Sequence, residues 1–449
     1  MSDAPSPLLS APPEAQATDR GLSRRRFLTV AAGAGAVAVA AGAGGALLGG
    51  AVGEALNGPN QAAPPATGIG DTARLGVIDF EGAHQAGVVR PVLQQPATLV
   101  AAFDVVAPDR AALDAMFREL TKRTRDLASA WSPDAGDPLF PPPESGVVGS
   151  STGPADLTVT VSVGASLFDG RFGLGDRRPR QLTEMPVFPN DVLDPDLSHG
   201  DVLIQISAVD QVACIHALRY LQLGVRDALR LRWMQEGFTR PDPVPTPGHT
   251  TTRNLLGFKD GTANPHADDA MEMDQLVWVG AGESDEPAWT AGGSYAVVRL
   301  IRMFVERWDR TALGEQEGII GRTKRTGAPL GQGREEDIPA FDADPDGKKI
   351  ALSAHIRLAN PRTAATDRHR ILRRGYSYSR GFDDAGLLDQ GLLFIAYQRD
   401  LDNGFGAAQK RLDGEALEEY IRPVGGGYFF TLPGVTGTDG YLAEGLLAS

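Results

Sequence analysis

The residue types best suited to chemistry fall in three short segments, and the first is residues 254–265, NLLGFKDGTANP. Asp-Gly and Asn-Pro are common turn dipeptides, so a plain turn is one interpretation. In the other, Gly257 and Gly261 let the backbone approach a flat ligand while Asp260 presents a carboxylate for proton transfer. The local sequence leaves both interpretations open.

The other two segments, residues 353–362 and 371–379, combine one histidine with an unusual density of arginine. A lone histidine such as His355 is more often a surface or core residue than a ligand. The neighbouring cations make a ligand role for His355 more favourable, because they gather in an otherwise acidic chain. They are Arg357, Arg362, Arg373 and Arg374. Such a group favours a local anion site, and a cofactor that carries carboxylates would suit it.

The elements that must position these segments are clearest in the first half of the chain. Apolar residues predict a strand over 99–106, and apolar residues at helical spacing predict a helix after Pro108. Period-two alternation predicts strands over 157–163 and 202–206, followed by a helix over 210–232 and a strand over 233–238. This β-α-β-β-α-β order is typical of a ferredoxin-like unit.

The second half repeats this order more loosely. We expect strands over 295–305, 392–398 and 427–432, helices over 309–320 and 414–421, and an exposed loop over 324–349. The sequence therefore predicts an α+β fold with duplicated ferredoxin-like halves, residues 71–245 and 246–449, whose antiparallel sheets pack together.

Composition excludes several classes of protein. The 449 residues carry 43 basic and 57 acidic side chains, a net charge of −14, which argues against a nucleic-acid binder. The hydrophobic fraction of 42% is too high for a disordered chain. The single cysteine, Cys214, excludes a disulfide scaffold and any multi-cysteine metal site.

Residues 1–70 are interpreted as a targeting segment and linker. Arg24, Arg25 and Arg26 precede a long uncharged run, which resembles a twin-arginine export signal. A membrane anchor is the alternative, but the many glycines of the run weaken it. We expect export by the twin-arginine translocase to the periplasm or the cell exterior, and such clients are usually folded around a cofactor.

Taken together, the three segments resemble the dye-decolorizing peroxidase family, in particular its exported deferrochelatase/peroxidase-like branch. The resemblance covers nearly all of the chain after residue 70, including residues 391–394 and 424–430. It implies one haem b per chain, held in the C-terminal half of a dimeric α+β barrel-like fold. It also implies the use of hydrogen peroxide to oxidise dyes and other bulky aromatic donors.

The resemblance also assigns roles to individual residues. It implies that Asp260 shuttles a proton, that His355 is the axial iron ligand and that Arg373 stabilises charge. Glu415 is the implied acidic partner of His355, with Glu418 and Glu419 close by in the sequence. Further implied contacts with the cofactor are Gly257, Phe258, Lys259, Gly261, Arg357, Arg362 and Arg374. An aspartate base stays ionised in mildly acidic solution, so we expect activity at acid pH.

Two other functions stay open at this stage. The first keeps the haem but removes its iron, as a deferrochelatase or a haem protein that serves iron-uptake partners. The second is a non-enzymatic exported binding module. Assembly into a homo-oligomer is also open. A bulky donor would need a surface residue that passes its electrons to the haem, and the five tryptophans are the candidates for this role. Each of them is more readily explained as a core residue.

Overall fold

The structure is a computed structural model that describes residues 76–129, 136–149, 155–240, 251–283 and 285–448. The expected export signal and the expected division between residues 245 and 246 lie outside the described residues, and both stay predictions. Within the described ranges, no helix combines the length and apolar character needed to cross a bilayer.

The N-terminal half forms the predicted ferredoxin-like unit. Its elements are β1 (Ala97–Val105), α1 (Arg110–Ala128), β2 (Thr158–Gly164), β3 (Val202–Ala208), α2 (Gln211–Val225) and β4 (Leu229–Phe238). The strands pair in the order β2-β3-β1-β4. Both helices start at an aspartate N-cap: Asp109 accepts from the N–H of Ala112 and Asp210 from that of Ala213.

The helix predicted over 210–232 is too long. α2 ends at Val225, and β4 already begins at Leu229, where it pairs with Val105 of β1. Residues 229–232 therefore belong to a strand, because long-range hydrogen bonding to β1 outweighs their helical periodicity.

The C-terminal half has the same strand order but more irregular connections. Its main sheet contains β7 (Ser294–Met303), β9 (Tyr376–Phe382), β10 (Leu388–Gln398) and β11 (Ile421–Thr431), in the order β9-β10-β7-β11. Short elements fill the gaps, and they are β5 (Thr252–Arg253), β6 (Lys259–Asp260), α3 (Ala270–Leu276), α4 (Val305–Trp308), α5 (Leu313–Ile320), α6 (His355–Ala359), β8 (Leu372–Arg373), α7 (Ala407–Leu412) and α8 (Glu444–Leu447).

Three expectations for this half are corrected. Residues 376–382 form strand β9, which was not among the expected strands, because its pairing with the distant β10 defines it. The helix expected over 414–421 is wrong: only the short 3-10 turn Ala416–Glu419 lies there, and the helix α7 precedes it. The helix expected over 309–320 is confined to α5, since residues 309–312 form a turn and a bend outside any helix.

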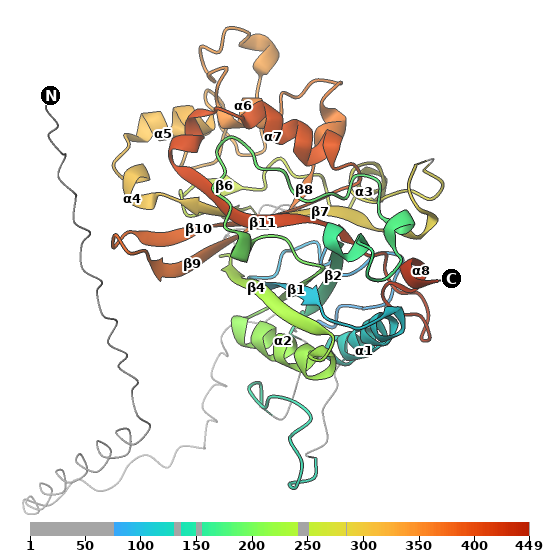
Figure 1. The fold of residues 1–449 in the computed structure, drawn as a ribbon. Helices are drawn as coiled ribbons and strands as arrows, with labels where there is room; N and C mark the ends of the chain where they lie inside the picture. Colours follow the sequence, from blue (N-terminus) through green and yellow to red (C-terminus); the bar gives the residue numbers. More distant parts are fainter. Residues whose placement is uncertain (1–75, 130–135, 150–154, 241–250, 284, 449) are drawn as a thin grey trace, which may run out of the picture. The chain divides into compact units, whose positions relative to one another are not determined.

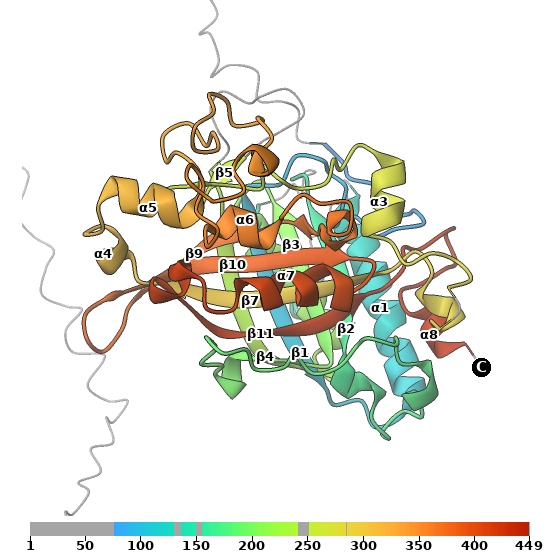
Figure 2. The ribbon, with the colours of Figure 1, turned by 90° about the horizontal axis from the view of Figure 1, so that it is seen from above.

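The two four-stranded sheets join edge to edge. Phe429 of β11 pairs with Gly164 of β2, and Phe238 of β4 pairs with Ser377 of β9, so the pairings form a closed ring (Figures 1 and 2). Side chains from both halves fill its interior, among them Trp233, Val298 and Tyr376. The predicted fold class, an α+β barrel-like arrangement of two antiparallel sheets, is confirmed.

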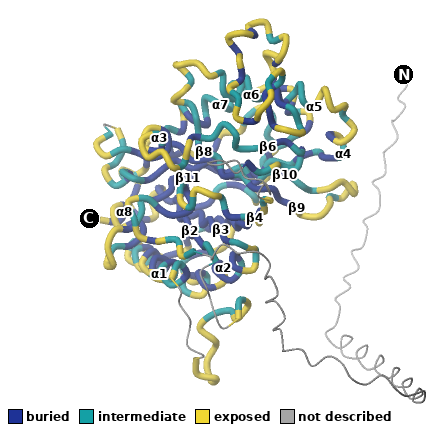
Figure 3. Tube along the Cα trace, turned by 180° about the vertical axis from the view of Figure 1, so that it is seen from behind, coloured by how far each residue is buried: buried dark blue, intermediate teal, exposed yellow. Residues whose placement is uncertain are grey.

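The outer faces of the two sheets are covered differently. On the N-terminal sheet, α1 and α2 pack through fully buried side chains such as Leu113 and Phe117. On the C-terminal sheet, the cover consists of α5, α6, α7 and long loops whose outer parts are exposed (Figures 1 and 3). The loop 324–349 is not simply exposed, as had been expected, because Ala328, Glu335 and Phe341 are buried.

An ion pair that lies almost entirely out of solvent links the two halves. Arg299 of β7 pairs with Asp191, and their side chains are 2% and 1% exposed. The guanidinium also lies over the ring of Phe188, 4.9 Å from its centroid. Removal of one partner would leave the other charge buried and uncompensated.

We therefore expect Asp191→Asn to destabilise the fold by about 3–5 kcal/mol. Asp285→Asn is the matched control, because its pair with Arg180 is about 60% exposed on both sides and should contribute less than about 1 kcal/mol. Denaturant unfolding of both variants measures the difference, and equal midpoints would contradict the expectation.

Candidate active site

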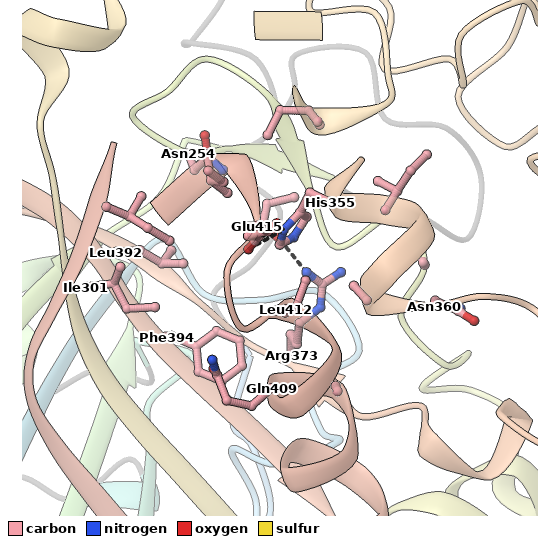
Figure 4. Close-up of a pocket in the computed structure, with 18 of the residues that line it drawn as sticks. Asn254, Ile301, His355, Asn360, Arg373, Leu392, Phe394, Gln409, Leu412 and Glu415 are labelled. Carbon is pink, nitrogen blue, oxygen red and sulfur yellow. Dashed lines mark hydrogen bonds and ion pairs between the residues drawn. The ribbon is translucent and has the colours of Figure 1, made fainter. Parts of the chain in front are cut away.

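A large pocket lies on the outer face of the C-terminal sheet. Its floor is apolar and comes from alternate residues of two paired strands, Ile301 and Met303 of β7 and Leu392 and Phe394 of β10. The pocket has about 1800 Å³ of empty volume, its open mouth included. Figure 4 shows Ile301, Leu392 and Phe394 along the strands, with His355, Glu415 and Arg373 beside them.

His355 and Glu415 form a hydrogen-bonded pair in this pocket. His355 begins α6, and its Nδ1 lies 2.8 Å from Oε2 and 3.1 Å from Oε1 of Glu415, whose side chain is 4% exposed. Burial opposes a charged imidazole, but the nearby carboxylate outweighs it and raises the pKa of His355. Since the carboxylate occupies Nδ1, Nε2 is the nitrogen left for a ligand.

The structure distinguishes between the three neighbouring acids. Glu415 bonds to His355, whereas Glu418 accepts from the N–H of Gly414 and Glu419 extends into solvent with 65% of its side chain exposed. Glu415 is therefore the carboxylate in position to act on the histidine.

Asp260 and Arg373 form the second pair. Asp260 ends β6, Arg373 ends β8, and the Nη1 of Arg373 donates to Oδ1 of Asp260 at 2.9 Å. Asn264 holds the arginine in place: its amide donates to the Arg373 carbonyl at 2.7 Å, and its Oδ1 accepts from Arg373 Nε at 3.3 Å. The sequence placed Asn264 in a turn and missed this role, for which the Asn-Pro dipeptide gave no signal.

The remaining residues of the first segment are divided between the pocket and its support. Phe258, Lys259 and Gly261 line the pocket. Gly257 does not: it adopts φ +84°, and a side chain there would lie 2.5 Å from Cε of Lys324. The glycine therefore allows close packing against Lys324, and the expected approach of its backbone to a ligand is not seen.

Only two of the four predicted arginines line the pocket, Arg362 and Arg373. Arg357 instead donates to the backbone carbonyls of Asp344 and Ile350, at 2.8 and 2.9 Å. Arg374 follows Arg373 in an extended segment, so its side chain points to the other side of the sheet. There it is 3% exposed and donates to the carbonyl of Pro91. The expected cofactor contacts of Arg357 and Arg374 are therefore not supported.

Three arginines that the sequence did not single out also line the pocket: Arg322, Arg370 and the Arg299 of the buried ion pair. Burial, and then the charge of Arg362, lower the pKa of Arg322 to about 10. Burial and the charge of Arg370 likewise lower the pKa of Arg362. Arg322, Arg362, Arg370 and Arg373 thus line the same pocket, and this environment favours anionic groups of a ligand.

The donor set fits haem. The floor is apolar and suits a flat ring, the cations suit its propionates, and an imidazole with a carboxylate on its other nitrogen is a common arrangement for an iron ligand. The Asp260–Arg373 pair adds a proton acceptor and a fixed positive charge to the same pocket. Fold and site together thus define a haem-binding oxidoreductase.

Comparisons with known proteins identify the family. The model of the Dyp-type peroxidase C-terminal domain matches residues 251–436, and that of the N-terminal domain matches residues 85–239. The chain belongs to the Dyp-type peroxidase family. The resemblance inferred from its motifs is thereby confirmed.

Close relatives and solved structures agree with this assignment. The deferrochelatase of Escherichia coli strain K12 is 53% identical over 369 residues, which cover 82% of this chain and 86% of that protein. Ferric DtpA from Streptomyces lividans is 36% identical with a TM-score of 0.75, covering 86% of this chain and 100% of that one. A DyP-type peroxidase from Cellulomonas bogoriensis is also 36% identical, with a TM-score of 0.73 over 84% and 99% of the two chains.

The chain is therefore an enzyme, a haem-dependent peroxidase. This finding sets aside the alternative of a non-enzymatic binding module.

Proposed function

We propose that the protein binds one haem b per chain and uses hydrogen peroxide to oxidise dyes and other bulky aromatic donors. The observation that carries this proposal is that one apolar pocket is lined both by the His355–Glu415 pair and by the Asp260–Arg373 pair. An absorption spectrum of the purified protein with and without peroxide tests it. A haem band that responds to peroxide supports the proposal, and a haem-reconstituted protein that does not respond contradicts it.

In this proposal, haem supplies the iron centre that takes up the oxidising equivalents of peroxide. Asp260 accepts a proton from one oxygen of hydrogen peroxide and returns it to the other oxygen, which leaves as water. The Arg373 guanidinium stays charged and stabilises the negative charge that develops on the leaving oxygen. Asn264 holds Arg373 so that both groups act at the same place.

His355 would hold the haem iron through Nε2, while Glu415 accepts a hydrogen bond from Nδ1. This hydrogen bond would make the imidazole richer in electrons and favour the oxidised state of a bound metal.

We expect Glu415→Gln to raise the reduction potential of the haem iron, because a neutral amide donates less electron density through His355 than a carboxylate does. Redox titration of the holoprotein measures the shift. Glu419→Gln is the control, since that side chain is exposed and bonds to no ring nitrogen. A potential that does not change in Glu415→Gln would remove the proposed role of this carboxylate.

Haem deferrochelation is the second candidate, and the name of the 53% identical relatives favours it. The two activities separate in one experiment, in which haem is added to the protein and both free iron and dye oxidation are followed. Iron release without peroxide-dependent dye oxidation would favour the second candidate, whereas the reverse would favour the first. Contact with iron-uptake proteins belongs to the second candidate alone.

We also propose export by the twin-arginine route, on the strength of Arg24 and Arg25 in the targeting segment. Replacement of both arginines by lysine should retain the protein in the cytoplasm. Unchanged export of that variant would contradict the proposal.

A further inference from the structure

Glu335 lies at the centre of a buried polar cluster beside the proposed catalytic segment. Its side chain is 7% exposed, and its carboxylate pairs with Lys259 and accepts hydrogen bonds from Thr251 and Thr262, the latter at 2.9 Å. These three partners belong to one short stretch of chain that carries Asp260. One carboxylate therefore holds this stretch at its start, next to Asp260 and just beyond it.

The loop that carries Glu335 is itself fixed in place. Arg322 donates through Nη1 to the carbonyl of Gly327 at 2.6 Å and to that of Glu335 at 2.9 Å. Gly327 adopts φ +77°, and a side chain there would lie 2.9 Å from Cδ of Lys259. The 322–335 loop therefore packs closely around Lys259, and this packing fixes the position of the Glu335 carboxylate relative to the Lys259 ammonium.

The electrostatic consequence concerns the pair next along the chain. Lys259 and Asp260 are consecutive, and both line the pocket. If the charge of Glu335 were removed, the Lys259 ammonium would attract Asp260 more strongly and compete with Arg373, whose Nη1 now lies 2.9 Å from Oδ1 of Asp260. Burial opposes the charge of Glu335, but Lys259 and the two threonines together lower its pKa, so the carboxylate remains ionised in mildly acidic solution.

We propose that Glu335 is a positioning residue for the peroxide reaction. Its carboxylate balances the charge of Lys259 and holds the 251–262 stretch so that Asp260 faces Arg373. This inference rests on the proposed proton-transfer role of Asp260. It assigns a function to the loop between α5 and α6, for which the sequence indicated only exposure.

The test compares the second-order rate constant for the reaction of hydrogen peroxide with the holoprotein in four variants. We expect Glu335→Gln, which keeps an acceptor for the threonines but loses the charge, to lower this constant about 10–100-fold, since small misplacements of a catalytic group have effects of this size. The KM for the reductant should stay unchanged. Asp337→Asn is the matched control, a carboxylate of the same loop whose partners among the described residues are Gly333 and Arg334, and it should react like the parent protein.

A double-mutant cycle with Lys259→Met separates positioning from a general effect on the fold. If Glu335 acts by neutralising Lys259, Glu335→Gln should change the rate constant less than about threefold when Lys259 is already methionine. The inference would be overturned if Glu335→Gln lowered the rate constant equally in the parent protein and in Lys259→Met, or if it did not lower the rate constant in the parent protein. If Glu335→Gln alone fails to fold around haem, recovery of haem and rate in the double variant supports the inference, and its failure to recover overturns it.

Asp260→Asn, measured alongside, separates a failure of the proton-transfer role of Asp260 from a failure of the positioning role of Glu335. If this variant reacts normally with peroxide, the proposed function of Asp260 fails. If it is slow while Glu335→Gln is not, only the role of Glu335 fails.

Discussion

His355→Ala should abolish stable haem binding. His355 is the imidazole whose Nδ1 is already engaged by a buried carboxylate, so Nε2 is the one free to bind iron. Loss of an outer partner of a metal ligand typically lowers affinity about 10–100-fold, and loss of the ligand itself should cost more. Haem titration of the apoprotein, followed at the haem absorption band, measures the affinity directly.

His369 provides the comparison within the same pocket. It also lines the pocket, but its Nδ1 lies 3.1 Å from the guanidinium of Arg411, so that nitrogen accepts a hydrogen bond from a cation. Burial, followed by the charge of Arg411, lowers the pKa of His369. We expect His369→Ala to bind haem with the same absorption spectrum as the parent protein. Retained haem with an unaltered spectrum in His355→Ala would show that another residue is the ligand.

Asp260→Asn should retain haem but react with peroxide about 10²–10⁴-fold more slowly, the usual contribution of general acid–base catalysis. The amide keeps the shape of the side chain and still accepts a hydrogen bond from Arg373, but it cannot take up the peroxide proton. Stopped-flow measurement of the reaction between peroxide and the holoprotein gives the rate constant.

Asp268→Asn is the matched control for this variant, because Asp268 lies nearby in the chain and is exposed. It should react like the parent protein. If Asp260→Asn reacts at the parent rate, Asp260 does not transfer the proton, and the Arg373 guanidinium would be left as the proposed source of catalysis.

Much of the fold could be predicted because its elements are defined by local patterns. Alternation over 157–163 and helical spacing after Pro108 match β2 and α1 closely. The errors occur where pairing with distant strands decides the structure. Residues 229–232 fit a helix by periodicity but become strand because β1 lies alongside them, and β9 forms as part of the C-terminal sheet by pairing with β10.

For the site, sequence resemblance selected the chemistry, and the fold decided which side chains meet. His355 and Glu415 lie 60 residues apart in the chain, and Asp260 and Arg373 lie 113 apart. Alternation along the extended segment 372–374 turns Arg373 toward the pocket and Arg374 away from it, although the two have the same chemistry. Lys259 gave no sign of a partner 76 residues away in a loop that was expected to be exposed.

By itself, the sequence determined the class of fold, the family and the residue types that a haem peroxidase needs, because periodicity and motifs are local properties of the chain. Only the tertiary structure decided which arginines reach the pocket, which glutamate meets the histidine and where Glu335 acts. The physical reason is that burial and ion pairing depend on contacts between distant segments, and these contacts exist only once the two sheets have joined and the loops of the C-terminal half have packed over them.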